Sequence, residues 1–399
     1  MTELLQAPTG GSSALGAGFN LVNTIIGSGI LALPYALREA GFYFGAFSLV
    51  LVAVLVYFSL LALIHGGRAS ALYKYEQVAR AALGPLGHRA SAFALTVNSL
   101  GSCTSYLIII GDTLSAFAPW PKQTVIVATA VVCTLPLLFF RTLEPLVRAS
   151  VVSTLCLPVI VGIVAVRGPS YTRAPAPTPV FGPSVLPAFG VIAFAFACTQ
   201  TCFQSYLIMR NKAEWSRAAG FATALALAIY LLFSISSYMA FGLQTEPNLL
   251  NNFDNDDVLA NIARALLAFS LLLTYPMQFY PVRDLLNDAL GLHHGAGFNL
   301  VAVGLFALTL ATALVVDDLG VVFKLVGTAA SSLIVFVLPG AIYLKLVSLR
   351  KHEAAPLLLT ASSNAKEPLM FSVSVLLLVL GAFVFVIGTW GSIADMFSR

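Results

Sequence analysis

Charged residues are scarce in this 399-residue chain. They make up 10% of the sequence, whereas 59% of the residues are hydrophobic and the mean hydropathy is +0.91. An ordinary soluble domain carries about 25% charged residues. So little polar surface cannot cover a soluble fold of this size. The composition therefore predicts that most of the chain lies within a lipid bilayer.

Several other features are missing. The net charge is only +4 and there is no long run of Lys and Arg, which excludes nucleic acid as a partner. The five cysteines show no metal-binding spacing, and no cofactor is expected. No soluble catalytic domain fits between the apolar segments, and no catalytic pairing is visible at membrane depth, so we expect no enzyme. The N-terminus lacks the basic region of a signal peptide, which predicts that the first apolar segment is retained.

What is present is a series of apolar segments, each long enough to cross a bilayer. They predict an all-α membrane protein with eleven transmembrane helices at 15–38, 43–64, 91–118, 124–140, 143–166, 185–209, 218–242, 258–281, 297–316, 319–347 and 369–392. A short amphipathic helix is predicted at 71–83, either covering the bundle or lying on the membrane surface. The proline-rich stretch 169–187 is expected to be an extended loop.

The basic residues predict the orientation. With the N-terminus inside, fourteen of the 21 Lys and Arg residues fall in inner connections. The positive-inside rule then favours a cytoplasmic N-terminus and an extracellular or lumenal C-terminus. The expected domains are a tail at 1–14, one transmembrane domain at 15–392 and a tail at 393–399.

The first segment carries its own helix breaker, "NTIIGSGI" at 23–30. Glycine costs a helix interior about 1 kcal/mol relative to alanine. Unwound backbone in a membrane is tolerated only where it faces protein, water or a ligand, and two half-helix ends could hold a zwitterion. Alternatively, Gly27 and Gly29 only allow close helix packing. The sixth segment has a polar run at a corresponding place, from Cys198 to Cys202, without glycines.

The sequence resembles the amino acid/auxin permease family, and within it the sodium-coupled neutral amino acid transporters. The resemblance is carried by "FNLVNTIIGSGILALPYALREAG" (19–41), "YLIIIGDTLS" (106–115), "LPAFGVIAFAFACTQTCFQSYL" (186–207) and "NDDVLANIARALLAFSLLLTYPMQFYPVRDLL" (255–286). The second and fourth of these look most like the transporter 11 branch. The resemblance implies a LeuT-like fold of two inverted five-helix repeats, at about 15–166 and 185–347, with an extra helix at 369–392.

The resemblance also implies site residues. A sodium ion would lie between the first and eighth helices, on the side chains of Asn23 and Thr274 and the carbonyls of Val22 and Ile25. The alternative for Thr274 is a hydroxyl bonded to its own helix. The substrate would lie at the two broken helices, against Thr24, Ile26, Gly27, Ser28, Gly29, Ala197, Cys198 and Thr199.

Asp112 is the carboxylate placed well inside a predicted span. We expect it to pair with Arg264 or Lys324 at the outer ends of other spans; the alternative is a role on the transport route. Asp254, Asp256 and Asp257 are expected to cap the start of the eighth helix rather than to bind calcium, because the glycine and glutamate of a calcium loop are missing.

Together these observations predict a monomeric transporter of small neutral amino acids in the plasma or endolysosomal membrane, coupled to sodium. Two alternatives remain open. One is a membrane sensor that binds an amino acid with little flux, and the other is sodium-independent or proton-linked transport. The identity of the amino acid does not follow from the sequence.

Overall fold

The computed structural model describes residues 12–117, 119–139, 144–172, 175–292, 295–316, 318–353 and 366–397. This part of the chain is helical, and its one β-type pairing is a parallel bridge between Ser12 and Met209. The expectation of an all-α protein is therefore confirmed for the described residues.

The chain begins with a helix in three pieces, α1 (Ala14–Ile25), η2 (Ser28–Ala32) and α2 (Leu33–Ala40). The remaining α-helices are α3 (Phe42–Ser70), α4 (Tyr75–Ser115), α5 (Lys122–Thr129), α6 (Leu135–Leu137), α7 (Glu144–Arg167), α8 (Val185–Ala195), α9 (Cys202–Leu207), α10 (Trp215–Phe241), α11 (Val258–Leu290), α12 (Gly295–Val315), α13 (Leu319–Val326), α14 (Leu338–Glu353), α15 (Lys366–Phe383) and α16 (Thr389–Phe397). The short 3₁₀ or π segments are η3 (Ala130–Thr134), η4 (Gly168–Tyr171), η5 (Thr199–Thr201), η6 (Lys212–Glu214), η7 (Gly242–Gln244), η8 (Leu249–Asn252), η9 (Gly327–Ser331), η10 (Leu333–Val337) and η11 (Val384–Gly388).

Eight helices in the described residues are long and apolar enough to cross a membrane. The pair α1 and η2–α2, bent by 52°, adds a ninth. Two shorter apolar helices, Lys122–Leu137 and Leu155–Tyr171, lie where the fourth and fifth spans are predicted. Large apolar side chains such as Leu232, Leu300 and Trp390 are more than 70% exposed on the outside of the bundle, as a lipid environment requires.

Two local predictions have clear outcomes. The segments 297–316 and 319–347 are separate helices, as predicted, and Asp318 caps the second one through the Gly320 amide. The amphipathic helix predicted at 71–83 forms the first part of α4, which turns at Gly84 with a φ of 71°. Its Tyr75 is buried and donates a hydrogen bond to the Ile334 carbonyl at 2.7 Å, so this segment covers the bundle.

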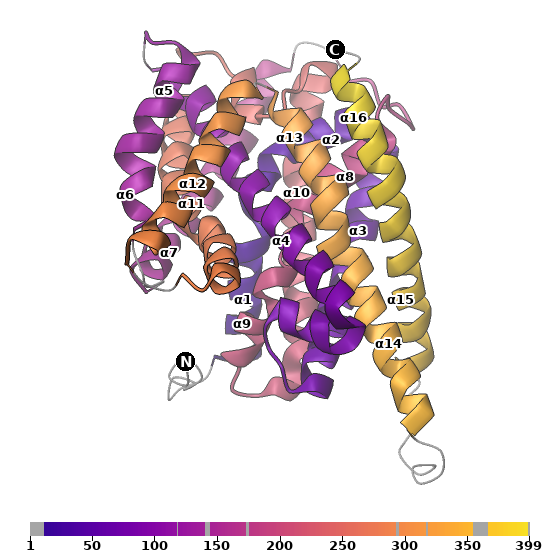
Figure 1. The fold of residues 1–399 in the computed structure, drawn as a ribbon. Helices are drawn as coiled ribbons and strands as arrows, with labels where there is room; N and C mark the ends of the chain where they lie inside the picture. Colours follow the sequence, from indigo (N-terminus) through magenta and orange to yellow (C-terminus); the bar gives the residue numbers. More distant parts are fainter. Residues whose placement is uncertain are drawn as a thin grey trace.

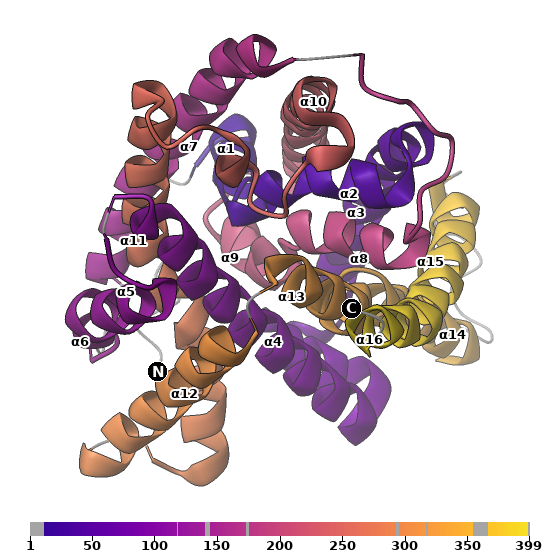
Figure 2. The ribbon, with the colours of Figure 1, turned by 90° about the horizontal axis from the view of Figure 1, so that it is seen from above.

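The helix packing places the broken helices at the centre. α1 packs on α10, while α8 packs against α2, η2 and η9 (Figure 2). α11 lies against α4 and α7 on one flank, and α15 lies beside α14 on the other (Figure 1). The start of α1 and the end of α16 lie at opposite ends of the bundle, which we call the N-terminal face and the C-terminal face (Figure 1).

Of the three aspartates predicted to cap α11, Asp257 is the one at the N-cap position. Its Oδ1 accepts hydrogen bonds from the amides of Leu259 and Ala260. Its Oδ2 binds the Arg167 guanidinium at 2.7 Å. Burial by itself would raise the pKa of Asp257, but the hydrogen bonds from Arg167, the Ala260 amide and Tyr171 hold this pKa at about 2. The carboxylate therefore stays charged and ties α11 to the end of α7.

Candidate functional site

The first helix is broken where the sequence predicts it. The amide of Ile26 makes the last α-helical hydrogen bond of α1, to Val22. Ile26 then has a ψ of 79°, and Gly27 is extended with φ −107° and ψ −156°. The chain resumes as η2 at Ser28, in a new direction. Backbone groups next to Gly27 thus lie outside a regular helical ladder.

The sixth span is also interrupted, although it has no glycine there. α8 ends at Ala195, and Phe196 and Cys198 leave helical geometry before η5 begins at Thr199. The amide of Cys198 bonds to the carbonyl of Phe196, two residues earlier, instead of continuing the helix. The polar run from Cys198 to Cys202 therefore marks a second break, as predicted.

The two breaks meet in space. A Cβ at Gly29 would lie 2.8 Å from the Cα of Ala195, so the two backbones are in close contact. The buried hydroxyl of Tyr230, on α10, lies 2.5 Å from the Ile25 carbonyl and 2.9 Å from the Ala195 carbonyl and bonds to both. These carbonyls end α1 and α8. Tyr230 therefore joins both breaks, and nothing in its apolar sequence surroundings predicts this role.

The structure distinguishes the two glycines of the first break. Gly29 serves close packing, because Ala195 leaves no room for a side chain. A Cβ at Gly27 would meet no atom within 4 Å, so Gly27 borders open space. Packing therefore does not require glycine at position 27.

The contrast between the glycines gives a matched test. Gly29→Ala should reduce amino acid uptake at least tenfold, because overpacking against backbone costs about 1–3 kcal/mol and shifts the two breaks relative to each other. Gly27→Ala should reduce uptake less than Gly29→Ala does, since the added methyl meets no atom of the protein. Uptake per mole of inserted protein is the measurement. Equal losses in the two variants would show that packing at Gly29 does not set the site.

A chain of neutral polar side chains borders the second break. The Asn98 amide donates to Gln200, at 3.5 Å, and Gln200 donates to Gln278 at 3.2 Å. Ser331 donates to Asn98 at 3.0 Å. These residues come from α4, η5, α11 and η9, so the network joins both halves of the chain. Gln200 belongs to the polar run noted in the sequence, whereas Asn98, Gln278 and Ser331 were missed, although polar side chains inside apolar spans are a visible signal.

This network reaches the first break as well. Tyr106 of α4 is buried, and its hydroxyl lies beside both Gln278 and Ser28. Ser28 begins η2 and is itself buried. The two breaks are thus bordered by amide and hydroxyl side chains, which are uncharged at physiological pH and can hydrogen-bond a neutral polar molecule.

The other predicted substrate residues are divided between buried and partly accessible positions. Ile26, Cys198 and Thr199 are buried, and the Thr199 hydroxyl donates to the Ile334 carbonyl. Thr24 and Ala197 are half-buried, and the Thr24 hydroxyl donates to the Asn20 carbonyl within its own helix.

The two side chains predicted to bind sodium lie on α1 and α11, two helices that do not pack closely against each other. Asn23 is exposed on α1, which packs against α10 and α9. Thr274 is half-buried on α11, and its hydroxyl donates to the Ser270 carbonyl at 2.8 Å, as the alternative for this residue predicts. The carbonyls of Val22 and Ile25 accept from the Ile26 amide and the Tyr230 hydroxyl.

The pairing predicted for Asp112 is wrong. Its Oδ1 lies 2.7 Å from the ammonium of Lys122, at the start of α5, rather than near Arg264 or Lys324. Arg264 instead donates to the Leu250 and Phe253 carbonyls. Lys122 follows Asp112 by ten residues in the sequence. The two side chains meet because α5 folds back along α4.

This pair can be tested by charge exchange. Asp112→Asn should lower thermal stability by about 1–2 kcal/mol, between the values of exposed and buried ion pairs, because both side chains are partly buried. Combining Asp112→Lys with Lys122→Asp should recover part of the loss relative to either single reversal. Combining Asp112→Lys with Arg264→Asp should not. The melting temperature in detergent reports the difference, and rescue by Arg264 instead of Lys122 would contradict the pairing.

Lys324 belongs to a different cluster, buried at the C-terminal face. Its ammonium binds Glu39 Oε2 at 2.5 Å and Asp395 Oδ2 at 3.0 Å. Arg38 holds the other oxygen of Glu39 and donates to the Thr245 carbonyl. We call this set the lysine cluster; it consists of Arg38, Glu39, Ser184, Lys324 and Asp395. It joins α2, the start of α8, α13 and α16, and the sequence analysis did not find it.

Comparisons with known proteins agree with this architecture. Residues 10–393 match the family described as transmembrane amino acid transporter protein. The chain is 31% identical over 391 residues to the "Putative sodium-coupled neutral amino acid transporter 11" of Mus musculus, covering 93% of this chain and 84% of that protein. It is 25% identical over 386 residues to vacuolar amino acid transporter 2 of Saccharomyces cerevisiae, and this match covers 88% of this chain and 80% of that protein.

The fold also matches a solved structure. A Na⁺-coupled sialic acid symporter in a substrate-bound, outward-open state aligns with a TM-score of 0.57 and 13% identity, over 96% of this chain and 88% of that one. At this identity the match shows a shared, LeuT-like fold alone. The family match, the relatives and the apolar helices have one explanation. The chain is a multi-pass integral membrane protein that belongs to the transmembrane amino acid transporter family, a family of transporters and not of enzymes.

Proposed function

We propose that this protein is a secondary active transporter that moves small neutral amino acids by alternating access around the two helix breaks. The observation that carries the proposal is the junction of the breaks: Gly29 against Ala195, and Tyr230 on both half-helix carbonyls. Half-helix ends provide amide donors and carbonyl acceptors for the carboxylate and ammonium of an amino acid. We further propose that all eleven predicted segments cross the membrane, with the N-terminus cytoplasmic.

We propose that the structure represents a state closed at the C-terminal face and open at the N-terminal face. The lysine cluster and the Arg38–Thr245 hydrogen bond support closure at the C-terminal face. Opening at the N-terminal face is supported by Asn20 and Asn23, which are exposed on α1. Amide side chains avoid hydrocarbon, so their exposure favours a water-filled space beside α1. Asn20 also donates to Ser205, which ties α1 to α9.

We propose that transport is coupled to sodium through a site that forms when the N-terminal face closes. If α1 moves toward α11 when the N-terminal face closes, Asn23 and Thr274 approach each other and share one ion with the carbonyls of the break. Sodium is a hard cation and is served by such neutral oxygens. In the state described here Asn23 is exposed, which agrees with a sodium site that forms only on closure.

Uptake into proteoliposomes tests the proposal. The purified protein should take up one or more of a panel of radiolabelled small neutral amino acids, and a sodium gradient should accelerate this uptake. Parallel assays with potassium or a proton gradient separate the coupling modes. Saturable binding without accumulation would instead support a sensor, and absence of both binding and uptake would refute the proposal. Assays on plasma membrane and endolysosomal vesicles would identify the membrane.

A further inference from the structure

Helix α4 holds one irregular segment of the second half of the chain at two separate points. This segment runs from Ser331 to Ile334, where the π-helical segment η9 ends and the π-helical segment η10 begins. Asn98, in the membrane part of α4, accepts a hydrogen bond from Ser331 at 3.0 Å. Tyr75, which precedes the turn of α4 at Gly84, donates to the Ile334 carbonyl at 2.7 Å. π-Helical interruptions of this kind are frequent at functional sites.

The Ile334 carbonyl has a second side-chain donor, at the second break. The hydroxyl of Thr199, the first residue of η5, donates to the same oxygen at 3.1 Å. A carbonyl oxygen has two lone pairs, so it can accept both bonds at once. Tyr75 is 3% exposed and both Thr199 and Ile334 are fully buried, so bulk water does not reach these groups. The Ile334 carbonyl therefore connects the start of α4 to the start of η5.

The segment that carries this carbonyl is fixed against the helix that leads into the second break. A Cβ at Gly327, the first residue of η9, would overlap the carbonyl oxygen of Gly190 on α8. A Cβ at Gly190 would lie 2.8 Å from the amide nitrogen of Thr328. The backbones of η9 and α8 are thus in direct contact, and α8 ends at the second break. Because the segment cannot shift, the hydrogen bonds set the direction of the Ile334 carbonyl.

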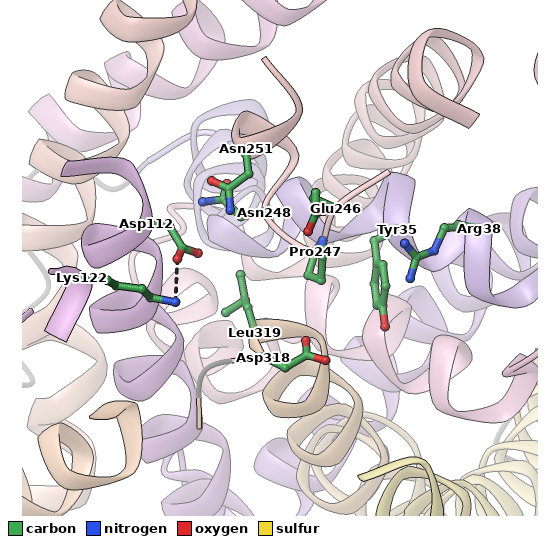
Figure 3. A pocket seen from close by; sticks show the side chains of 10 residues that line it. All are labelled: Tyr35, Arg38, Asp112, Lys122, Glu246, Pro247, Asn248, Asn251, Asp318 and Leu319. Atoms are coloured by element: carbon green, nitrogen blue, oxygen red, sulfur yellow. Dashed lines mark ion pairs between the residues drawn. The ribbon is translucent and has the colours of Figure 1, made fainter. Parts of the chain in front are cut away.

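Tyr75 lies toward the N-terminal face, where α4 begins (Figure 1). A cavity of about 380 Å³ lies at the C-terminal face, where Asp112 and Lys122 face Arg38 across it (Figure 3). None of its ten lining residues takes part in the hydrogen bonds to the Ile334 carbonyl. A change at Tyr75 therefore cannot alter the binding of an amino acid by direct contact in this cavity.

We propose that Tyr75 is a positioning residue for the transport site. Its hydroxyl directs the Ile334 carbonyl toward Thr199, and this carbonyl in turn holds η5 in the geometry that binds the amino acid. Tyr75 does not touch the amino acid in this arrangement and acts only through the carbonyl. The inference rests on the proposed function, because that function places the amino acid at the two breaks.

Equilibrium binding to the full chain in lipid nanodiscs tests the proposal, with tritiated glycine, L-alanine and L-serine as probes. Tyr75→Phe removes only the hydroxyl, and it should raise the dissociation constant of a bound probe about two- to tenfold, the effect of losing one hydrogen bond. The number of binding sites per chain should equal that of the wild type. A variant that was merely less stable would instead lose binding sites at an unchanged dissociation constant.

The matched control is Tyr73→Phe, which removes the same atom from a nearby residue. The Tyr73 ring stacks on Tyr206 with centroids 6.0 Å apart, and its hydroxyl makes no hydrogen bond with any described residue. This variant should therefore bind each probe with the dissociation constant of the wild type.

A double-mutant cycle shows whether Tyr75 acts through the Ile334 carbonyl. Thr199→Val removes the second donor with little change of shape and should also weaken binding. In the Thr199→Val background, Tyr75→Phe should change the dissociation constant less than about twofold, because the carbonyl no longer holds η5. Thr199→Ser keeps the donor, so the full effect of Tyr75→Phe should return in that background.

Two results would overturn this inference and leave the proposed function standing. One is an equal effect of Tyr75→Phe and Tyr73→Phe on the dissociation constant. The other is a double variant in which the effects of Tyr75→Phe and Thr199→Val simply multiply. If the wild type bound none of the probes, the proposed function would fail, and this inference would fail with it.

Discussion

Lys324→Met should destabilise the protein by about 3 kcal/mol, which would be seen as a marked drop in melting temperature. Removing one partner of a buried ion pair costs roughly 3–5 kcal/mol, because the other charge stays buried. Lys324 is 2% exposed and Glu39 is 5% exposed. We expect the lower end of the range, since Arg38 still holds Glu39 and the Asp395 side chain is 36% exposed.

The controls for Lys324 come from the same chain. Lys345→Met removes an exposed lysine from α14 and should leave the melting temperature close to that of the wild type. Asp395→Asn should cost less than about 1 kcal/mol, as for other exposed pairs, because Lys324 keeps Glu39. If Lys324→Met melted like Lys345→Met, the lysine cluster would not stabilise the closed C-terminal face.

Asn23→Ala and Thr274→Ala should each raise the sodium concentration needed for half-maximal uptake by roughly ten- to a hundredfold. Losing one neutral ligand costs about 1–3 kcal/mol, and 1.4 kcal/mol is a factor of ten. Because linkage is reciprocal, amino acid affinity should also fall at a fixed sodium concentration. Uptake measured over a range of sodium concentrations gives both quantities.

The matched control for Thr274 is Thr312, on α12, whose hydroxyl also bonds back to its own helix, at the Leu308 carbonyl. Thr312→Ala removes the same kind of hydrogen bond and should leave the sodium dependence unchanged. If Thr274→Ala behaved like Thr312→Ala, the hydroxyl of Thr274 would only satisfy its own helix. Wild-type uptake that is indifferent to sodium would favour facilitated or proton-linked transport.

The ion pairs show where sequence reasoning failed. Asp112 is easily recognised as a carboxylate within an apolar segment, but its partner depends on how α5 folds back along α4. Lys324 and Glu39 are 285 residues apart in the chain, and only the packing of α13 beside the end of α2 brings them together. Side-chain charges are visible in a sequence, whereas the pairs they form are a property of the packed bundle.

The sequence by itself determined the helical membrane architecture, the family and the positions of both helix breaks. The architecture and the breaks depend on local composition: long apolar runs must satisfy their own backbone in lipid, and polar interruptions such as those after Val22 and at Cys198 disturb the helix where they stand. The family follows from the resemblance of motifs such as the one at 19–41. Only the tertiary structure decided which side chains surround the breaks. Tyr230, Gln278 and Ser331 come from three separate elements, and their contacts arise because the helices that carry them pack around one centre.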